Sequence, residues 1–219
     1  MKKLVITIDG PSGSGKGTTA RGVARKLGLP HVDSGSIYRS VAYALDKHSI
    51  TADEDSAIEG FLTTFSLSYT EDGEVQINGE NKESEIRSRE NSKIAFLYSR
   101  NPIIRTYATQ FQRKRLQDGG VLDGRDAGTV VAPDADLKIY LDCDIEERLR
   151  RRVKQHGITD ATEMETLRQE IVDRDHADSN KGDASLTILP ESVVVDTSGM
   201  SVDEQIEAVY QKALETIGL

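Results

Sequence analysis

The chain has 219 residues, a length that suits one compact α/β domain with a small inserted lobe better than two domains of equal size. Hydrophobic residues make up 37%, which is enough for a core at this length. The net charge of −9 argues against a protein that binds a nucleic-acid duplex, since such proteins usually carry a basic surplus for phosphate contacts. Any anion site must therefore be a local cluster of Lys and Arg, which fits a small phosphorylated substrate better than a long polyanion.

The cysteine content and the apolar runs indicate the setting of the protein. The single cysteine, Cys143, cannot form an internal disulfide, and we expect it to be a small buried side chain at the end of a strand. The N-terminal segment MKKLVITID has too short an apolar run for a signal peptide. No apolar stretch approaches the ~20 residues that a membrane span requires. We therefore expect a cytoplasmic protein without a membrane span.

The first part of the chain is predicted to form a βαβ unit. The β-branched run Leu4–Ile8 indicates a buried strand. After a glycine-rich turn, apolar residues recur on one helical face, at Ala20, Val23, Ala24 and Leu27. Gly28 is expected to end this helix, and a short strand follows that ends at Asp33.

The next segment changes character. A second helix runs from about Ser36, and its apolar stripe comprises Ile37, Val41, Ala44 and Leu45. Residues 65–86 alternate around an Asp-Gly turn at 71–73 and an Asn-Gly turn at 78–79, which predicts a small antiparallel meander. Because the meander interrupts an otherwise α/β pattern, we interpret it as an insertion.

The remaining segments restore the alternation of helices and strands. They comprise a helical stretch over 88–117 with a break near Asn101 and Pro102, and strands at 121–123, 137–141 and 193–195. Asp144 with Glu147, and Ser201 with Glu204, have the capping-box spacing of a helix N-terminus. Gly157 marks a break between two helices.

This order of elements predicts a three-layer α/β/α fold with a five-stranded parallel sheet. In such sheets the ligand binds at the carboxyl ends of the strands. Four aspartates lie at the predicted strand ends: Asp9, Asp33, Asp123 and Asp142. We therefore expect the motifs beside them to converge on one edge of the sheet.

The motif after the first strand carries the clearest chemistry. Its residues are Gly10, Pro11, Ser12, Gly13, Ser14, Gly15, Lys16, Gly17 and Thr18. Glycines let successive N–H groups surround phosphate oxygens at a helix N-terminus, and Lys16 supplies a charge to the β- and γ-phosphates of ATP. A turn without a ligand is the alternative, and the position between a strand and a helix argues against it. Because Gly17 separates Lys16 from Thr18, the motif resembles those of nucleoside monophosphate kinases more than those of GTPases.

The segment Asp33–Arg39 follows the second predicted strand and opens a helix. Ser34 or Ser36 is expected to cap this helix. Arg39 lies one turn further on, where its guanidinium can present a bidentate fork to a phosphate. The alternative is an exposed arginine in a surface ion pair, and the position at the carboxyl end of a strand favours the phosphate contact.

The segment Asp123–Thr129 leaves the third core strand. Two glycines flank Arg125 and Asp126, which suggests tight backbone beside a ligand. A structural turn with a local ion pair is the alternative.

Further along the chain, Arg174 and Asp178 are four residues apart and share a helical face. They either bind a ligand or form an i,i+4 ion pair with each other.

The order of these motifs resembles bacterial cytidylate kinases over essentially the whole chain. The shared features are the phosphate loop, Asp-Ser-Gly-x-Ile-Tyr-Arg, the β insertion, Asp-Gly-Arg-Asp-x-Gly-Thr, and Arg-Asp-x-x-Asp-Ser-Asn near residue 174. The phosphate loop alone occurs in many kinases. The Asp-Gly-Arg-Asp turn and the β insertion indicate the cytidylate branch, since an adenylate kinase is expected to carry Asp-Gly-Phe-Pro-Arg at the turn.

The resemblance implies a kinase that transfers the γ-phosphate of ATP to CMP or dCMP. ATP would bind the phosphate loop together with Arg148 and Arg152 of a lid. The implied CMP-binding residues are Ser34, Arg39, Arg105, Arg125, Asp126, Arg174 and Asp178. The implied catalytic residues are Lys16, Arg125 and Arg174. Arg174 and Asp178 would approach the ribose hydroxyls and the nearby phosphate.

Base recognition follows from the chemistry of cytosine, which presents an exocyclic amine beside the N3 and O2 acceptors. By the family pattern, Asp126 accepts from the amine and Arg105 donates to N3 or O2. Uracil would place a carbonyl against Asp126, and a buried unsatisfied polar group costs ~1–3 kcal/mol. The same pattern has Arg39 and Arg125 hold the phosphate of the acceptor.

The resemblance also divides the chain into a core, an NMP-binding insertion and a short helical lid. The expected ranges are about 1–34, 99–150 and 172–219 for the core, about 35–98 for the insertion and about 151–171 for the lid. Lid closure would exclude water and limit ATP hydrolysis, whereas a solvated basic face is the alternative for the arginines over 148–152. Mg²⁺ is implied as a companion of ATP without assigned protein ligands, and a monomer is expected.

The sequence departs from the family pattern at three positions. The family usually has Ser nine residues before the base-reading Arg, where this chain has Phe96, with Ser92 and Ser99 about one helical turn to either side. Ala177 and Lys181 stand where similar kinases often carry Arg. Lys181 keeps the positive charge of Arg but not its planar fork, and Ala177 loses the charge. We therefore expect weaker binding of phosphate in this region and retained activity.

The expected mechanism is direct in-line transfer without a covalent intermediate. No general base is needed, because the attacking phosphate oxygen of CMP is already anionic. Three other functions stay open: a kinase for UMP, AMP or another small acceptor, a P-loop ATPase or switch without an acceptor, and a non-catalytic nucleotide-binding module. The acidic pI of about 5.0 and the arginine-rich acceptor segments weigh against the last two.

Overall fold

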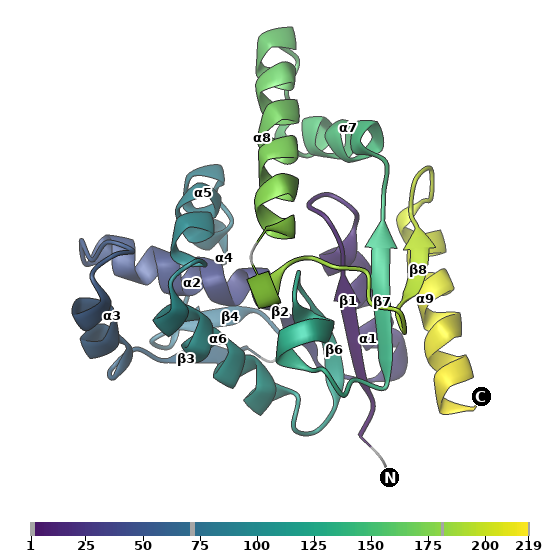
Figure 1. The fold of residues 1–219 in the computed structure, drawn as a ribbon, viewed down its shortest axis with the longest axis horizontal. Coiled ribbons are helices and arrows are strands. Elements are labelled where there is room, and N and C mark those ends of the chain that lie inside the picture. Colours follow the sequence, from purple (N-terminus) through teal and green to yellow (C-terminus); the bar gives the residue numbers. More distant parts are fainter. Residues whose placement is uncertain (1–2, 71–72, 181, 219) are drawn as a thin grey trace. The chain divides into compact units, whose positions relative to one another are not determined.

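A computed structural model describes residues 3–70, 73–180 and 182–218. The chain forms two compact units (Figure 1). Unit 1 comprises residues 1–31 and 116–219, and unit 2 comprises residues 32–115. Unit 1 therefore contains the phosphate loop and the predicted lid, and unit 2 contains the predicted insertion.

The main sheet has five strands. Their spatial order is β2 (His31–Asp33), β6 (Gly120–Asp123), β1 (Val5–Asp9), β7 (Leu137–Asp142) and β8 (Val193–Asp196). β1 pairs in parallel with β6 and with β7, and β7 pairs in parallel with β8. Short aliphatic runs favour strands that are buried on both faces of a parallel sheet. The predicted α/β fold with a five-stranded parallel sheet is confirmed.

Helices α1 (Lys16–Leu27) and α9 (Val202–Ile217) pack against each other and against this sheet. The buried cluster that joins them includes Ile6, Ile8, Ala20, Val23, Ile139, Leu141, Val209 and Ala213. Gly28 has φ 65° at the end of α1, and Ser201 with Glu204 forms both bonds of the capping box that opens α9. The predicted end of α1 and the predicted start of α9 are therefore confirmed.

Two helices follow the carboxyl end of β7 in unit 1 (Figure 1). α7 (Ile145–His156) and α8 (Ala161–Ser179) pack through a small apolar cluster that contains Leu167 and Ile171. Gly157 separates them with φ 64°, as predicted. A π-helical turn (Ala127–Val131) and a 3₁₀ turn (Gly182–Ala184) also belong to this unit.

The capping-box prediction at the start of α7 is half wrong. The Asp144 side chain accepts from Glu146 N at 2.8 Å and so caps the helix. Glu147 instead accepts from Arg151 Nε at 2.9 Å, and the N–H of Asp144 donates to Ser198 Oγ at 2.9 Å. A charge-assisted bond from a guanidinium is stronger than a bond from a neutral N–H, which explains why Glu147 turns away from the cap.

Unit 2 is built around α2. Its helices are α2 (Ser34–Lys47), α3 (Asp55–Leu62), α4 (Glu83–Ile86), α5 (Arg89–Tyr98) and α6 (Pro102–Arg115), and its strands are β3 (Leu67–Tyr69), β4 (Val75–Ile77) and β5 (Glu80–Asn81). The strands form an antiparallel sheet in the order β3-β4-β5, which confirms the predicted meander. Glu71 and Asp72 of the predicted turn lie outside the described residues. The predicted break at Pro102 separates α5 from α6.

The prediction that Ser34 or Ser36 caps α2 is wrong. The capping residue is Asp33, whose Oδ1 accepts from Ser36 N at 2.8 Å. Asp33 precedes the first helical turn and has extended backbone, as an N-cap residue requires. The serines therefore lie inside the first turn of α2, where both side chains are buried.

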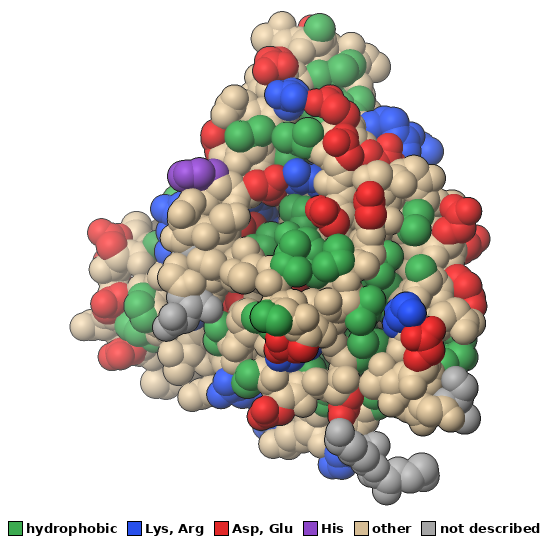
Figure 2. All heavy atoms as spheres, turned by 45° about the vertical axis from the view of Figure 1, so that its right-hand side comes forward, with side chains coloured by type: hydrophobic (Ala, Val, Ile, Leu, Met, Phe, Trp, Pro, Cys, Tyr) green, Lys and Arg blue, Asp and Glu red, His purple; other side chains and the backbone are tan. Residues whose placement is uncertain are grey.

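The distribution of charged side chains on the surface agrees with the net negative charge of the chain. On the face in Figure 2, acidic side chains are spread over the surface, and Lys and Arg side chains occur in separate small groups. Cys143 is buried, as predicted. Within the described ranges 3–70, 73–180 and 182–218, the helices are too short or too polar to cross a membrane.

Candidate active site

The phosphate loop joins β1 to α1 at the carboxyl end of the sheet. Gly13 and Gly15 have φ 86° and 97°, a region that L side chains rarely adopt, and Gly15 is the N-cap of α1. At Gly10 an added Cβ would lie 2.2 Å from Leu141 O. The buried Ser14 hydroxyl has no hydrogen-bond partner within the described part of the chain. A turn of this kind at a helix N-terminus binds phosphate.

Lys16 is buried in the first turn of α1, and its Nζ donates to Pro11 O at 2.7 Å. Burial and the Arg125 guanidinium lower the pKa of Lys16 well below its ordinary value, while Asp123 and Asp9 raise it. A triphosphate would bring negative charge and favour the ammonium form. The structure thus places Lys16 in the loop, and its catalytic role stays a prediction.

The predicted lid arginines lie against the loop. Arg148 is buried, donates to Ser12 O at 3.2 Å and pairs with Asp175 at 2.7 Å. Arg152 Nη2 donates to Ser12 Oγ at 2.5 Å. A solvated basic face is therefore wrong for these two arginines, although it describes Arg150, whose side chain is 67% exposed.

Arg125 and Arg174 share one carboxylate. Arg125 Nε donates to Asp178 Oδ2 at 2.9 Å, and Arg174 Nε lies 3.9 Å from the same oxygen. The Asp178 side chain is 2% exposed. The i,i+4 ion pair between Arg174 and Asp178 does form, and Arg125, from a distant segment of the chain, shares the same carboxylate. A buried carboxylate with two guanidinium partners holds both in place for an anion.

Asp9 fixes the turn that carries Arg125. Its Oδ1 accepts from Ala127 N at 2.9 Å, and its Oδ2 accepts from Gly128 N at 2.8 Å. These N–H groups open the π-helical turn directly after Asp126. The pKa of Asp9 is raised to about 6, because burial and, to a smaller extent, the charge of Asp126 outweigh the lowering effect of the two N–H bonds and of Lys16. Asp9 thus connects β1, which leads into the phosphate loop, to the turn that is predicted to read the acceptor.

A second aspartate faces the loop from β6. His31 Nε2 and Asp123 Oδ1 are 2.7 Å apart, and each side chain is 10% exposed. The other oxygen, Oδ2, lies 3.6 Å from the position that a Cβ on Gly17 would take. His31 therefore holds the carboxylate so that one oxygen faces the first turn of α1.

In unit 2, Asp33 is the centre of a charged cluster at the start of α2. Its Oδ2 lies 2.6 Å from Ser36 Oγ, 3.1 Å from Arg87 Nη2 and 3.4 Å from Arg39 Nη2. The buried Nε of Arg39 has no hydrogen-bond partner within the described residues. Ser34 is buried beside this cluster as the first residue of α2. Two guanidinium groups thus converge where a phosphate can bridge them.

Arg105 lies on α6, also in unit 2. Its Nη1 donates to Ser99 O at 3.3 Å, and its guanidinium is 6.0 Å from the centre of the Tyr38 ring. The Ser99 hydroxyl donates to Phe96 O at 2.9 Å. The predicted base-reading partner, Asp126, belongs to unit 1, and the pairing of the two residues stays a prediction.

Sequence reasoning missed several residues of the site. Arg151 and Thr197 both contact the backbone of the phosphate loop, and Arg87 joins Arg39 at Asp33. The rule that singles out aspartates at strand ends leads to Asp196, the last residue of β8, and passes over Thr197, which directly follows it. Lys181, which was expected to weaken the phosphate clamp, lies outside the described residues.

A loop that surrounds phosphate, a buried lysine within it and arginines held against it at the carboxyl edge of a parallel sheet are the parts of a P-loop phosphotransferase. The comparisons with known proteins narrow this class. A family model described as "Cytidylate kinase" matches residues 6–215. The chain belongs to the cytidylate kinase family, which confirms the resemblance seen in the sequence.

Curated relatives match the chain over almost its whole length. A cytidylate kinase of Ligilactobacillus salivarius is 38% identical, over 95% of this chain and 96% of that protein. A cytidylate kinase of Symbiobacterium thermophilum is 38% identical, over 98% of each.

Solved structures share the fold at low sequence identity. A shikimate kinase from Acinetobacter baumannii has a TM-score of 0.50 and 16% identity, over 98% of this chain and 94% of that chain. An uncharacterized protein from Eubacterium ventriosum has a TM-score of 0.56 and 13% identity, over 98% of this chain and 99% of that one. These likenesses concern the fold alone.

Proposed function

We propose that the chain transfers the γ-phosphate of ATP to CMP or dCMP, which gives ADP and CDP or dCDP. Its membership in the cytidylate kinase family supports the reaction. The proposal that ATP is the phosphate donor rests on the loop Gly10–Thr18, in which Lys16 is buried. The loop amides, the N-terminus of α1 and the ammonium group together suit a triphosphate.

On the donor side, the loop residues hold the phosphates and Lys16 stabilises the charge that shifts between the β- and γ-phosphates. Arg148 and Arg152 act with them from α7. Both already meet Ser12, so a bound phosphate adds contacts to side chains that are in place. The lid range of about 151–171 belongs to the same proposal.

On the acceptor side, Arg39 and Arg125 hold the phosphate of CMP, and Asp126 with Arg105 reads the base. Arg174 and Asp178 approach the ribose. Support within unit 1 comes from the buried Asp178, which holds Arg125 in place. Support within unit 2 comes from the buried Nε of Arg39, which has no hydrogen-bond partner among residues 3–70, 73–180 and 182–218. A buried guanidinium nitrogen without an acceptor is costly until a ligand arrives. Of these residues Arg39 belongs to the NMP-binding insertion, for which we keep the range of about 35–98.

Magnesium would enter with ATP. Within the described residues there is no group of three or more His, Cys, Asp or Glu side chains that could hold a metal ion. Two oxygen donors belong to this end of the loop: the hydroxyl of Thr18, an exposed residue, and the Oδ2 of Asp123 beside Gly17. Oxygen donors that share an ion with substrate phosphates fit Mg²⁺. When bound, the ion would neutralise charge on the β- and γ-phosphates.

The transfer needs no covalent intermediate. The protein binds both phosphates in line, excludes water and supplies positive charge, and a CMP oxygen attacks directly. A cytoplasmic monomer is part of this proposal.

The test is ADP production from ATP·Mg²⁺ with CMP, dCMP, UMP, AMP or no acceptor at matched concentrations. We expect fast turnover with CMP and dCMP alone. Equal turnover with UMP would contradict base reading by Asp126 and Arg105. Phosphate release without an acceptor would instead favour an ATPase, and ATP binding without turnover would favour a nucleotide-binding module.

A further inference from the structure

Four successive carbonyl groups of the phosphate loop each accept a hydrogen bond from a side chain. The pairs are Lys16 Nζ to Pro11 O at 2.7 Å, Arg148 Nη1 to Ser12 O at 3.2 Å, Arg151 Nη1 to Gly13 O at 3.4 Å and Thr197 Oγ1 to Ser14 O at 2.9 Å. The donors come from α1, from α7 and from the segment after β8. Side chains from three separate parts of unit 1 therefore hold the backbone of the loop.

The held carbonyls determine where the loop amides point. In a trans peptide unit the C=O of one residue and the N–H of the next point in opposite directions. A side chain that holds a carbonyl on one side of the loop therefore turns the following N–H to the other side. The amides of residues 12–15 follow the held carbonyls. Ser14 N donates to Pro11 O at 3.4 Å within the loop, and amides in the positions of residues 12, 13 and 15 bind phosphate oxygens in loops of this kind.

Thr197 is the donor with the most connections to fixed backbone. It is fully buried, and its hydroxyl lies 2.9 Å from Ser14 O and 2.9 Å from Asp142 O. Its own N–H also donates to Asp142 O at 2.9 Å. Loss of the hydroxyl would therefore leave Asp142 O with a partner and would mainly release Ser14 O.

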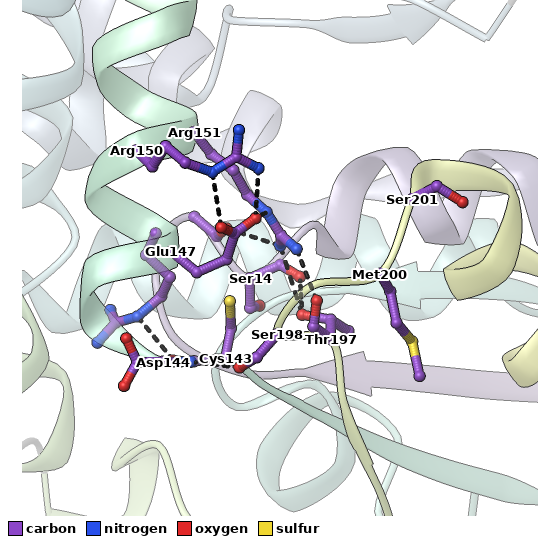
Figure 3. Close-up of polar contacts among 12 residues, drawn as sticks. Ser14, Cys143, Asp144, Glu147, Arg150, Arg151, Thr197, Ser198, Met200 and Ser201 are labelled. Atoms are coloured by element: carbon purple, nitrogen blue, oxygen red, sulfur yellow. Dashed lines mark hydrogen bonds and ion pairs between the residues drawn. The ribbon is translucent and has the colours of Figure 1, made fainter.

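Arg151 holds Thr197 from the side of α7. Its Nη2 donates to Thr197 O at 2.6 Å, and its Nη1 lies 3.4 Å from Thr197 Oγ1. Its Nε donates to Glu147 at 2.9 Å. Figure 3 shows this guanidinium between Glu147 and the Ser14–Thr197 pair. Bonds from Arg150 and then Arg151 lower the pKa of Glu147 to about 2, so the carboxylate that anchors Arg151 is charged at neutral pH.

We propose that Thr197, held by Arg151, is a positioning residue that sets the phosphate loop for the triphosphate of ATP. The inference rests on the proposed function only in taking Gly10–Thr18 as the ATP loop. Thr197 acts through the Ser14 carbonyl, and Arg151 acts through Thr197 and the Gly13 carbonyl. Loss of either side chain therefore weakens ATP binding selectively and leaves CMP binding unchanged.

Thr197→Val removes the hydroxyl and keeps a β-branched side chain of similar size. We expect the KM for ATP, and the Kd for ATP measured by isothermal titration calorimetry, to rise about tenfold, the effect of one buried hydrogen bond. The KM for CMP should stay within about twofold. Thr197→Ser, which restores the hydroxyl, should recover the affinity for ATP. Arg151→Gln should give a selective rise of the same kind.

Arg150→Gln is the matched control, because Arg150 bonds to the same Glu147 from an exposed position, with its side chain 67% exposed. We expect it to leave the affinity for ATP unchanged. An unaltered affinity for ATP in Thr197→Val would overturn the inference. Equal rises of both KM values with a lower Tm would also overturn it, since that pattern indicates a purely structural role.

Two further comparisons keep the test decisive. If Thr197→Val does not fold, equal ATP affinities of Arg151→Gln and Arg150→Gln would overturn the inference. Lys16→Ala separates this failure from that of the proposed function. Retained turnover in Lys16→Ala would refute the ATP loop itself, whereas an inactive Lys16→Ala beside a normal Thr197→Val would refute only the positioning role.

Discussion

The cations around the phosphate loop in unit 1 and those around Asp33 in unit 2 have different partners. Lys16, Arg148 and Arg151 donate to loop carbonyls, and the carboxylates that also pair with Arg148 and Arg151 lie outside the loop, on α8 and α7. Arg39 and Arg87 instead converge on the Asp33 carboxylate. A carbonyl is a neutral dipole and stays where the backbone places it, whereas a carboxylate carries a full charge that competes with a phosphate. The loop therefore has its shape before a ligand binds. In unit 2, the phosphate of CMP that we propose to bind there would have to displace the Asp33 carboxylate from Arg39 and Arg87.

This difference predicts different failures in the two regions. Variants around the loop should change how well ATP fits, because they alter backbone geometry. Variants around Asp33 should change how strongly an anion is attracted, and their effects should depend on salt.

The largest effect is expected for Lys16→Ala. The ammonium is the buried positive charge within the loop, and its loss should reduce kcat to background while circular dichroism and Tm stay near those of the wild type. Near-normal activity in a folded Lys16→Ala would refute the catalytic role. Steady-state rates of ADP formation by the wild type and the variant would measure the loss.

Arg39→Ala tests the anion exchange at Asp33. If Arg39 holds the phosphate of CMP as proposed, its loss should raise the KM for CMP roughly tenfold to a hundredfold, as charge-assisted hydrogen bonds predict. The KM for ATP should change little. Initial rates over a range of CMP concentrations at low and high salt would measure both effects. Arg100→Ala is the control in the same unit, because Arg100 stacks on Phe96 at 4.8 Å and is exposed. Equal effects of the two substitutions would contradict a specific role for Arg39.

The sequence was sufficient for the parts of the site that depend on local geometry. Strand ends, a glycine-rich turn and a helix start are adjacent in the chain, so the position of Lys16 could be predicted. The support for the loop could not, because Thr197 approaches Ser14 across 183 positions. The cap of α2 shows a smaller limit of the same kind. Asp33 and Ser36 both have capping side chains, and only the extended backbone at Asp33 decides between them.

Asp9→Asn addresses the connection between the two substrate sites. An ionised Asp9 accepts from Ala127 N and Gly128 N, whereas Asn has one acceptor oxygen and would oppose its NH₂ to the second N–H. The turn that carries Arg125 and Asp126 should loosen, and kcat/KM for CMP should fall about tenfold. Steady-state kinetics with each substrate varied in turn would measure the loss.

The pH dependence provides the control for Asp9. The pKa of Asp9 rises from 3.8 to about 6 on folding, so Asp9 favours the folded state below pH 3.8 and loses this contribution as the pH rises through 6. The carboxylate that accepts both N–H bonds is present only above about pH 6. The ratio of wild-type to Asp9→Asn kcat/KM should therefore rise through pH 6, and the titration of CMP itself cancels in this ratio. Lys16 and Asp126 are the charged groups that face Asp9. A ratio that is constant with pH would contradict the role of the ionised carboxylate.

Asp136→Asn is the matched variant, since Asp136 Oδ2 accepts from Val5 N at 2.9 Å at the opposite end of β1. It removes a carboxylate that supports the same strand away from the phosphate loop. Its expected effect is on Tm, with kcat/KM for CMP within about twofold of the wild type.

The smallest effect is expected for Glu147→Gln. Arg151 loses a charged anchor but keeps its bond to Thr197 O, so the KM for ATP should rise only about two- to threefold, in line with a partly exposed ion pair. The pKa of Glu147 falls from 4.5 to about 2 on folding. Its contribution to stability is therefore complete above pH 4.5 and is lost as the pH falls through 2. Urea unfolding at several pH values should show wild type and variant converging between pH 4.5 and 2. A difference in the free energy of unfolding that persists at pH 2 would indicate that Glu147 supports α7 through packing rather than charge. The change in the KM for ATP would then have to come from Arg151 alone.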